Sequence, residues 1–137
     1  MTTAGYSGTA LLKKLSIRPE MKIMLIDAPE NYIALIEEDI SKQLCKRNQL
    51  PDFIHLFVKN NKAFEAGMKK VLSLTKKNTQ LIVWASWHKK SSGIATDMTE
   101  DIIRNYALKN GLVNIKVCAV SDIWSGLKLV VPKSFRN

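Results

Sequence analysis

Glycine is scarce in this sequence, and the place where it is missing argues against one class of site. Six of the 137 residues are glycine, and none lies between Gly8 and Gly67. Dinucleotide and S-adenosylmethionine sites need glycine in the loop after the first strand of an α/β sheet, because the backbone approaches the ligand closely there. The first apolar run is instead followed by Asp27-Ala28-Pro29-Glu30, whose acidic residues repel a phosphate group. We therefore expect the chain to bind no cofactor.

Cysteine and histidine are few as well, with two of each scattered along the chain. No spacing typical of a zinc site exists, so we expect no metal. Cys45 and Cys118 do not form a close pair, and we expect both thiols to be reduced and buried. Every apolar run is far shorter than the ~20 residues of a membrane span. Residues 1–6 also lack the charged start and apolar core of a signal peptide, which predicts a cytoplasmic protein with no membrane contact.

Arginine is the rarer cation, with four residues against 17 lysines, while 12 acidic residues leave a net charge of +9. Residues 59–90 hold eight of the lysines and a single acidic residue, Glu65. Such a segment is either a solvated helix face or a surface that meets phosphates. Because bidentate recognition of bases and phosphates favours arginine, sequence-specific nucleic-acid binding is disfavoured. Weak, nonspecific binding remains an alternative, and it would use Lys62, Lys69, Lys70, Lys76 and Lys77.

What is present is an alternation of apolar runs and amphipathic segments. With 46% hydrophobic and 24% charged residues, the composition is that of a globular domain rather than a collagen, coiled coil or disordered tail. Apolar runs of strand type predict strands at residues 22–27, 53–58, 81–87, 115–120 and 127–131. Apolar residues at steps of three and four predict helices over 30–46 and 62–77, and a third from Asp97, capped against Glu100, to a left-handed cap at Gly111.

This order predicts a three-layer, open α/β sheet of about five strands. Strands separated by helices pair in parallel through right-handed crossovers. The connection at residues 121–126 is too short for a crossover, so the last strand should be antiparallel to its neighbours. We expect the order 1-2-3-5-4, Rossmann-like and resembling the second half of a class I methyltransferase domain. One domain would span residues 1–137, with an N-terminal extension of about 20 residues.

In such a sheet, ligands lie beyond the carboxyl ends of the strands. The residues expected there are an aromatic group beside cations and small hydroxyl side chains, suited to a planar or anionic ligand. The alternative is that Trp87 packs on the next helix and the lysines are only solvated. His55, which alternates within an apolar strand, is predicted to be a hydrogen-bonded core histidine. The candidate ligand residues are Tyr6, Ser7, Trp87, His88, Lys89, Lys90, Ser92, Asp97, Trp124 and Ser125.

Several motifs occur together in one order, and as a set they are fairly specific. They are Ala4–Thr9, Lys13–Leu15, His55–Val58, Trp84–Trp87, Ser92-Gly93, Thr96–Glu100, Lys116–Val120 and Trp124–Leu129. This pattern resembles a small bacterial family catalogued only as a domain of unknown function. The resemblance spans nearly the whole chain, except the acidic segment at 30–46. It implies a stand-alone bacterial cytoplasmic protein, and it supplies no catalytic residue.

The leading hypothesis is a degenerate methyltransferase-like domain that binds a small anionic ligand or a protein partner. A second hypothesis is an enzyme of unknown reaction that uses the 87–97 loop, with His88, Lys89 or Asp97 as the reacting group. His88 has Asp97 and Asp122 as possible partners, but no nucleophile signature accompanies it. The third is the nonspecific nucleic-acid binder described above. The missing glycine loop disfavours a nucleotide-dependent enzyme, so the sequence leans away from catalysis and leaves the second hypothesis open.

Overall fold

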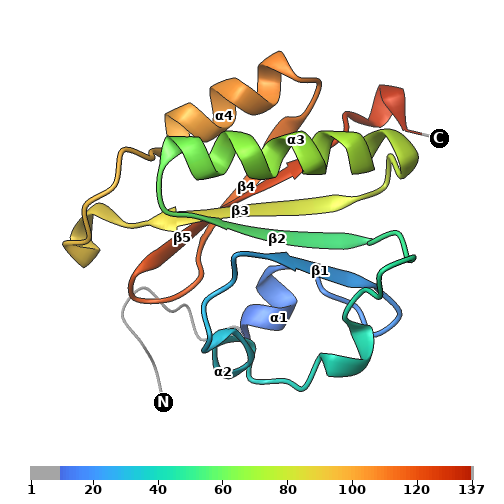
Figure 1. Ribbon diagram of the computed structural model, residues 1–137, viewed down its shortest axis with the longest axis horizontal. Helices are drawn as coiled ribbons and strands as arrows, with labels where there is room; N and C mark the ends of the chain where they lie inside the picture. Colours follow the sequence, from blue (N-terminus) through green and yellow to red (C-terminus); the bar gives the residue numbers. More distant parts are fainter. Residues whose placement is uncertain (1–9, 137) are drawn as a thin grey trace.

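The computed structural model describes residues 10–136, which form one open sheet with helices on both faces (Figure 1). Its strands are β1 (Ile23–Ile26), β2 (Phe53–Val58), β3 (Ile82–His88), β4 (Val113–Ala119) and β5 (Trp124–Val130). Its α-helices are α1 (Leu11–Lys14), α2 (Tyr32–Ile36), α3 (Asn61–Lys77) and α4 (Glu100–Lys109). Three 3₁₀ turns complete the chain, namely η1 (Ser41–Gln43), η2 (Lys90–Ser92) and η3 (Lys133–Phe135).

The sheet has the strand order β1-β2-β3-β5-β4, which confirms the predicted topology. The strands β1, β2 and β3 are mutually parallel, whereas β5 is antiparallel to both β3 and β4. β5 runs antiparallel to β4 because a tight turn joins them, in which the backbone N–H groups of Val120 and Ser121 both donate to Trp124 O. β5 therefore begins at Trp124, three residues earlier than predicted, and Gly126 lies within the strand.

Two hydrophobic cores lie on the two sides of the sheet. On the side of α3 and α4, Met68 and Ile103 pack with Leu56, Val83 and Leu127 of the strands. Gly67 lets α3 approach β2, because a Cβ there would lie 2.6 Å from a methyl carbon of Leu56. None of the helices in the 10–136 range combines the length and hydropathy that a membrane span requires.

On the other side, α1 and α2 cover β1, β2 and β3. Leu11, Leu15 and Tyr32 pack there with Phe57 and Trp84. The indole N–H of Trp84 donates to Leu15 O at 2.9 Å. The second half of the expected N-terminal extension is thus part of the core.

The predicted helix over residues 30–46 is wrong. Its apolar positions Tyr32, Ile36 and Ile40 are buried as expected, but α2 ends after five residues. Glu37 adopts a left-handed conformation, with φ at 61°, which ends the helix there. The chain then returns to the sheet, where Cys45 N donates to Ile23 O at 2.8 Å. The segment covers the outer edge of β1, which a continuous helix would leave open.

The predicted cap of α4 is also corrected. The N-cap is Thr99, whose hydroxyl accepts from Ile102 N at 3.2 Å. The carboxylate of Asp97 instead accepts from Asn61 N at 2.8 Å, at the start of α3. The other end of α4 is as predicted, because Gly111 has φ of 82° and Leu112 N donates to Ala107 O.

Candidate functional site

His88 and Trp124 meet at the carboxyl end of the parallel strands. His88 ends β3 and lies opposite Trp124, the first residue of β5. Their rings stack with centroids 4.0 Å apart and an interplanar angle of 26°. Phe57 of β2 meets Trp124 edge-on at 4.9 Å, and all three side chains are buried. We call the group of His88, Trp124, Lys59 and Lys89 the carboxyl-end cluster.

The imidazole of His88 is incompletely satisfied. Its Nδ1 atom is buried, and no hydrogen-bond partner reaches it within the described part of the chain. Burial lowers the pKa of His88, and the nearby charge of Lys59 lowers it further, so the ring is neutral near pH 7. A buried polar atom without a partner costs roughly 1–3 kcal/mol, which is why native proteins keep few of them.

Three lysines lie at this end of the sheet, and the charge of Lys59 acts on His88. Lys59 follows β2, Lys89 follows β3, and Lys14 Nζ donates to Ala119 O, the last residue of β4, at 3.1 Å. The backbone N–H of Lys89 donates to Ile123 O at 2.9 Å, which joins the end of β3 to the β4–β5 turn. Burial raises the pKa of Cys118, while Lys14, Lys116 and Lys89 oppose that shift, so these charges lie close to its thiol.

Trp87 does not face Trp124. The strands β3 and β5 are neighbours, as predicted, but Trp87 lies opposite Ser125 and His88 lies opposite Trp124. Side chains alternate along a strand, so Trp87 points to the α3–α4 side, where it packs in the core with 8% of its surface exposed. Ser125 is half-buried on that same side. The two tryptophans therefore lie on opposite faces of the sheet.

The remaining predicted residues that the structure describes lie in loops, where they form hydrogen bonds. Lys90 and Ser92 lie in η2, where Ser92 Oγ donates to Lys89 O at 2.6 Å and accepts from Ile94 N. Asp97 is exposed and caps α3, as described above, and His88 Nδ1 forms no hydrogen bond with it. Tyr6 and Ser7 lie outside the described residues. Of the predicted set, the structure brings His88, Lys89 and Trp124 together.

His55 is a satisfied core histidine, as predicted. Its Nδ1 is 2.9 Å from the hydroxyl of Tyr32, and its Nε2 is 2.7 Å from Ser86 Oγ. Burial lowers the pKa of His55 to about 3, so the ring stays neutral. Gly126 passes beside this chain of hydrogen bonds, since a Cβ there would lie 3.3 Å from Ser86 Oγ and 3.1 Å from the Trp84 ring.

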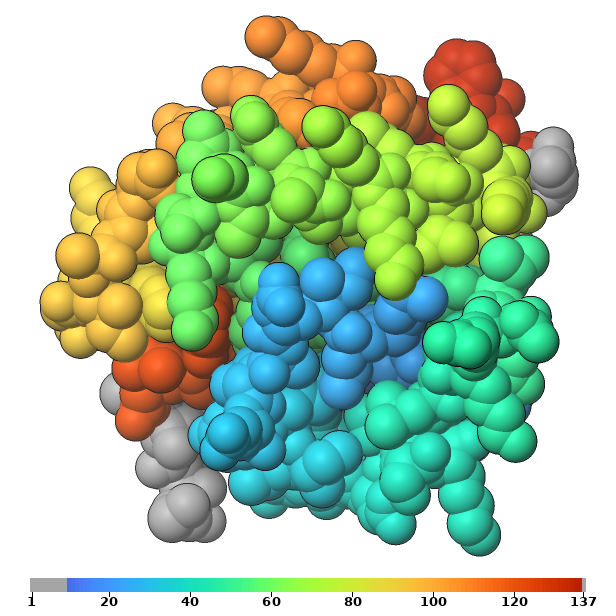
Figure 2. Space-filling model, viewed as in Figure 1, coloured from blue at the N-terminus to red at the C-terminus, as the bar shows by residue number. Residues whose placement is uncertain are grey.

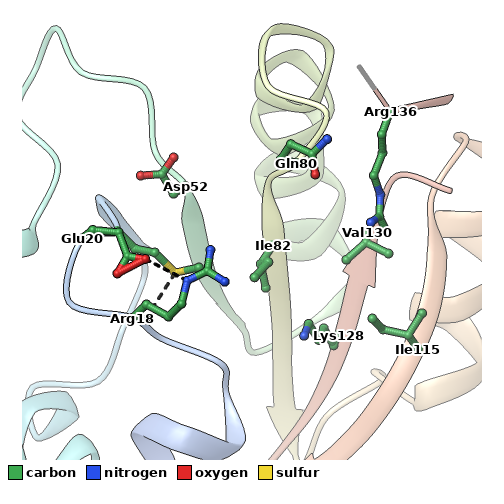
Figure 3. Close-up of a pocket in the computed structure, with 10 residues that line it drawn as sticks. Arg18, Glu20, Asp52, Gln80, Ile82, Ile115, Lys128, Val130 and Arg136 are labelled. Carbon is green, nitrogen blue, oxygen red and sulfur yellow. Dashed lines mark hydrogen bonds and ion pairs between the residues drawn. The ribbon is translucent and has the colours of Figure 1, made fainter. Parts of the chain in front are cut away.

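Sequence reasoning missed a cavity at the opposite, amino end of the sheet. The cavity measures about 360 Å³ (Figure 3). Its lining comes from separate segments of the chain and carries three cations; we call it the amino-end pocket. It is lined by Arg18, Glu20, Met21, Asp52, Gln80, Ile82, Ile115, Lys128, Val130 and Arg136.

The described residues contain no cluster of typical metal-ligand side chains. No group of three or more His, Cys, Asp or Glu side chains converges within residues 10–136. Both cysteines are free thiols; Cys118 is buried, as predicted, but Cys45 is only half-buried.

The comparisons with known proteins address the fold alone. No family model matches the sequence, and no curated protein matches it. A Streptococcus agalactiae protein of the NADB-Rossmann superfamily aligns with 93% of this chain and 70% of its own, at 8% identity and a TM-score of 0.48. The B. subtilis M1A22 tRNA methyltransferase TrmK aligns with 93% of this chain and 68% of its own, at 10% identity and a TM-score of 0.49. The fold is Rossmann-like, and the sheet order described above is the basis for that assignment.

Proposed function

We propose that this chain is a ligand-binding domain with a methyltransferase-like sheet, and that it binds a small anionic ligand at the carboxyl-end cluster without transferring a methyl group. The observation that carries the proposal is the buried, unpartnered Nδ1 of His88 on a rigid aromatic stack. The place also fits, because ligands of open α/β sheets bind beyond the carboxyl ends of the strands.

Each member of the cluster has a physical role in this proposal. The neutral imidazole of His88 supplies a hydrogen bond, while Lys59 and Lys89 supply the positive charge. Trp124 has one face against His88 and an edge contact with Phe57, so its orientation is fixed before a ligand arrives. A preformed wall of this kind lowers the ordering cost of binding. Exposed acids at strand ends, Asp27 and Asp122, limit the net positive charge, which favours a small ligand over a polyanion.

The loop after β1 supports the absence of methyl transfer. Asp27 occupies a left-handed conformation with φ of 55°, where glycine would let a ligand approach the backbone. The helix that follows, α2, has only five residues, and the backbone N–H of Tyr32 is already bonded to Pro29 O. We expect calorimetry to detect no binding of S-adenosylmethionine or NAD at ordinary concentrations, and micromolar affinity for either would contradict the proposal.

Replacing His88 by Phe tests the proposed site. Phenylalanine keeps a ring against Trp124 and removes the unpartnered nitrogen, so the free protein should be as stable or more stable. Thermal shift measurements would use inorganic phosphate, pyrophosphate, citrate and adenosine monophosphate, because a ligand that binds only the folded state raises Tm. We expect H88F and K59Q to lose a shift that the wild type shows. The matched control is K62Q, which removes an exposed lysine of α3. A shift that is undiminished in H88F and K59Q for every probe would refute the site.

A second function is favoured by one observation on α3. Lys62, Lys69, Lys70, Lys76 and Lys77 are all exposed, and no ion pair involves them in the 10–136 segment. Figure 2 shows α3, in green to yellow-green, lying across the surface with no other segment over its outward side. Nonspecific binding to a nucleic-acid backbone is compatible with this surface.

A further inference from the structure

The amino-end pocket owes its position to the antiparallel direction of β5. Asp52 precedes β2 and Ile82 opens β3, whereas Val130 closes β5. Because β5 runs against β3, its last residues lie where β2 and β3 begin, and residues far apart in the chain line one cavity of about 360 Å³ (Figure 3). Trp124 and Val130 mark the two ends of β5, so this pocket is separate from the carboxyl-end cluster.

Cations from three segments line this pocket. Arg18 follows α1, Lys128 lies in β5, and Arg136 follows η3. A fourth cation, Lys116, lies opposite Lys128 in the β4–β5 register. Figure 3 shows Lys128 and Arg136 toward the β5 side of the pocket and Arg18 on the opposite side, with Ile82 of β3 between them. The pocket thus brings Arg18 close to Lys128 and Arg136, which lie more than 100 residues later in the sequence.

Both acidic residues of the pocket already have partners, and one of those partners is a pocket cation. Glu20 pairs with Arg18 at 3.0 Å, and Asp52 Oδ2 accepts from the backbone N–H of Lys22 at 2.9 Å. In the residues that the structure describes, Lys116, Lys128 and Arg136 form no ion pair. Arg136 uses Nε to hold Val131 O at 2.7 Å, which fixes the guanidinium while its terminal amino groups make no hydrogen bond within that region.

Lys128 is fixed in an environment that disfavours its charge. Its Nζ donates to Ser16 Oγ at 3.2 Å, and Ser16 is one of three non-glycine residues with a positive φ in the described chain. Burial lowers the pKa of Lys128, and the charges of Lys116, Arg136 and Arg18 lower it further. Like charges held this close destabilise one another, and an anion among them would relieve that repulsion.

The rest of the lining is apolar or amide. Met21, Ile82, Ile115 and Val130 form its hydrophobic part, and Gln80 adds an amide. A cavity near the lower end of the usual small-molecule range suits a compact ligand rather than a dinucleotide. Lys128 and Arg136, the two lining cations without an ion pair in the described part of the chain, suit a dianion, for which a guanidinium group offers a matching pair of donors.

We propose that the amino-end pocket binds a small organic phosphate, with its phosphate between Lys128 and Arg136 and its carbon skeleton against Ile82 and Ile115. A phosphate monoester meets both requirements, since it carries about two negative charges and an apolar body. The same cations could instead meet the phosphates of a polymer, which the experiment separates from the small ligand.

The test is isothermal titration calorimetry with phenyl phosphate, inorganic phosphate and benzoate as probes. We expect phenyl phosphate to bind more tightly than inorganic phosphate, because its ring buries apolar surface, and more tightly than benzoate, because benzoate carries one charge. K128Q and R136Q should each lower the affinity for phenyl phosphate by about tenfold or more, which is the usual effect of losing a charge-assisted hydrogen bond. The wild-type urea-unfolding midpoint should be kept or raised in K128Q, since it removes a mutually repelled charge.

Two control variants separate this pocket from general electrostatics. K133Q removes an exposed lysine in η3 that does not line the pocket, and K62Q removes an exposed lysine of α3 that also lies outside the pocket. Both should bind phenyl phosphate as the wild type does. The proposal is overturned if K133Q loses as much affinity as K128Q, or if inorganic phosphate binds as tightly as phenyl phosphate. It is equally overturned if none of the three probes binds at millimolar concentration while an oligonucleotide does.

Discussion

Two histidines point to the same side of the sheet, and their hydrogen bonding differs. In His55 both ring nitrogens have a partner, Tyr32 on one side and Ser86 on the other. In His88 the buried Nδ1 has none among residues 10–136. The first arrangement contributes to the core, since satisfied buried polar groups fix one packing. The second costs stability in the free protein, which is why His88 and not His55 is the candidate for ligand contact.

Both rings make stability depend on pH. The pKa of His55 is lowered to about 3, below its ordinary value near 6.5, so the folded state binds fewer protons than the unfolded state. The free energy of unfolding should therefore fall as pH drops below 6.5, by up to ~1.4 kcal/mol per pH unit for His55 alone. His88, whose pKa is also lowered, adds to the same slope.

Urea unfolding at pH 7, 6 and 5 measures this slope before most carboxylates titrate. The H88F variant isolates the part due to His55, and we expect it to keep most of the slope. A free energy of unfolding that stays constant from pH 7 to pH 5 would mean that His55 is protonated in the folded protein.

Trp87 should behave as a core residue. It is 8% exposed and packs with Met98 and Leu127 on the α3–α4 side. Trp87→Ala should lower the free energy of unfolding by ~3–5 kcal/mol, as for other buried large aromatics. The milder Trp87→Phe variant should fold and keep the thermal shift of the carboxyl-end cluster. A loss of that shift in Trp87→Phe at unchanged stability would place Trp87 in the ligand site.

At the scale of elements, periodicity predicted burial better than conformation. Tyr32, Ile36 and Ile40 fall at helical spacing and are buried, yet the chain turns at Glu37. The segment packs over the outer edge of β1, and this tertiary packing outweighed the local preference for a continuous helix. Asp97 failed as a cap of its own helix for a similar reason, since a helix from another part of the chain offered it an N–H group. The sheet order was predictable because connection length limits how strands can pair.

The left-handed turn at Glu37 gives a prediction for the segment between β1 and β2. A non-glycine side chain in the left-handed conformation destabilises the folded state by ~1–2 kcal/mol. Glycine avoids this strain but loses more backbone entropy on folding, at a cost of ~0.5–1 kcal/mol. Glu37→Gly should therefore raise the free energy of unfolding by about 0.5–1 kcal/mol. Its matched control is Glu38→Gly, at a neighbouring exposed residue without positive φ, which should lower it. Equal effects of the two variants in urea unfolding would contradict the assigned turn.

At the scale of the whole molecule, the sequence pointed to a candidate site at one end of the sheet and gave no sign of the cavity at the other end. The carboxyl-end loops follow the strands directly, so His88, Lys89 and Trp124 could be found from the order of elements. The face that each side chain takes depends on register, and for that reason the predicted set combined Trp87 with Trp124, although the two lie on opposite faces of the sheet. The amino-end pocket had no local signal, because Arg18, Lys128 and Arg136 meet only through the direction of β5.

The net charge of +9 makes nucleic-acid binding a whole-molecule question. If the α3 lysines contact phosphates, log K should fall with log salt by roughly 0.9 for each contact on duplex DNA. We expect weak binding at low salt that disappears near physiological salt, measured by fluorescence anisotropy. Tight binding at physiological salt that is lost when Lys69, Lys70 and Lys76 become Gln would favour the nucleic-acid function over small-ligand binding.

The insertion of β5 between β3 and β4 also has a consequence during protein synthesis. β4 is made before β5, but its only strand partner in the described sheet is β5. Until residues 124–130 leave the ribosome, β4 has no strand to pair with, and β3 exposes the edge that Leu127 and Leu129 will later cover. Unpaired edges of this kind promote association between chains. The nascent protein is therefore most prone to aggregate after β4 is complete and before β5 is added.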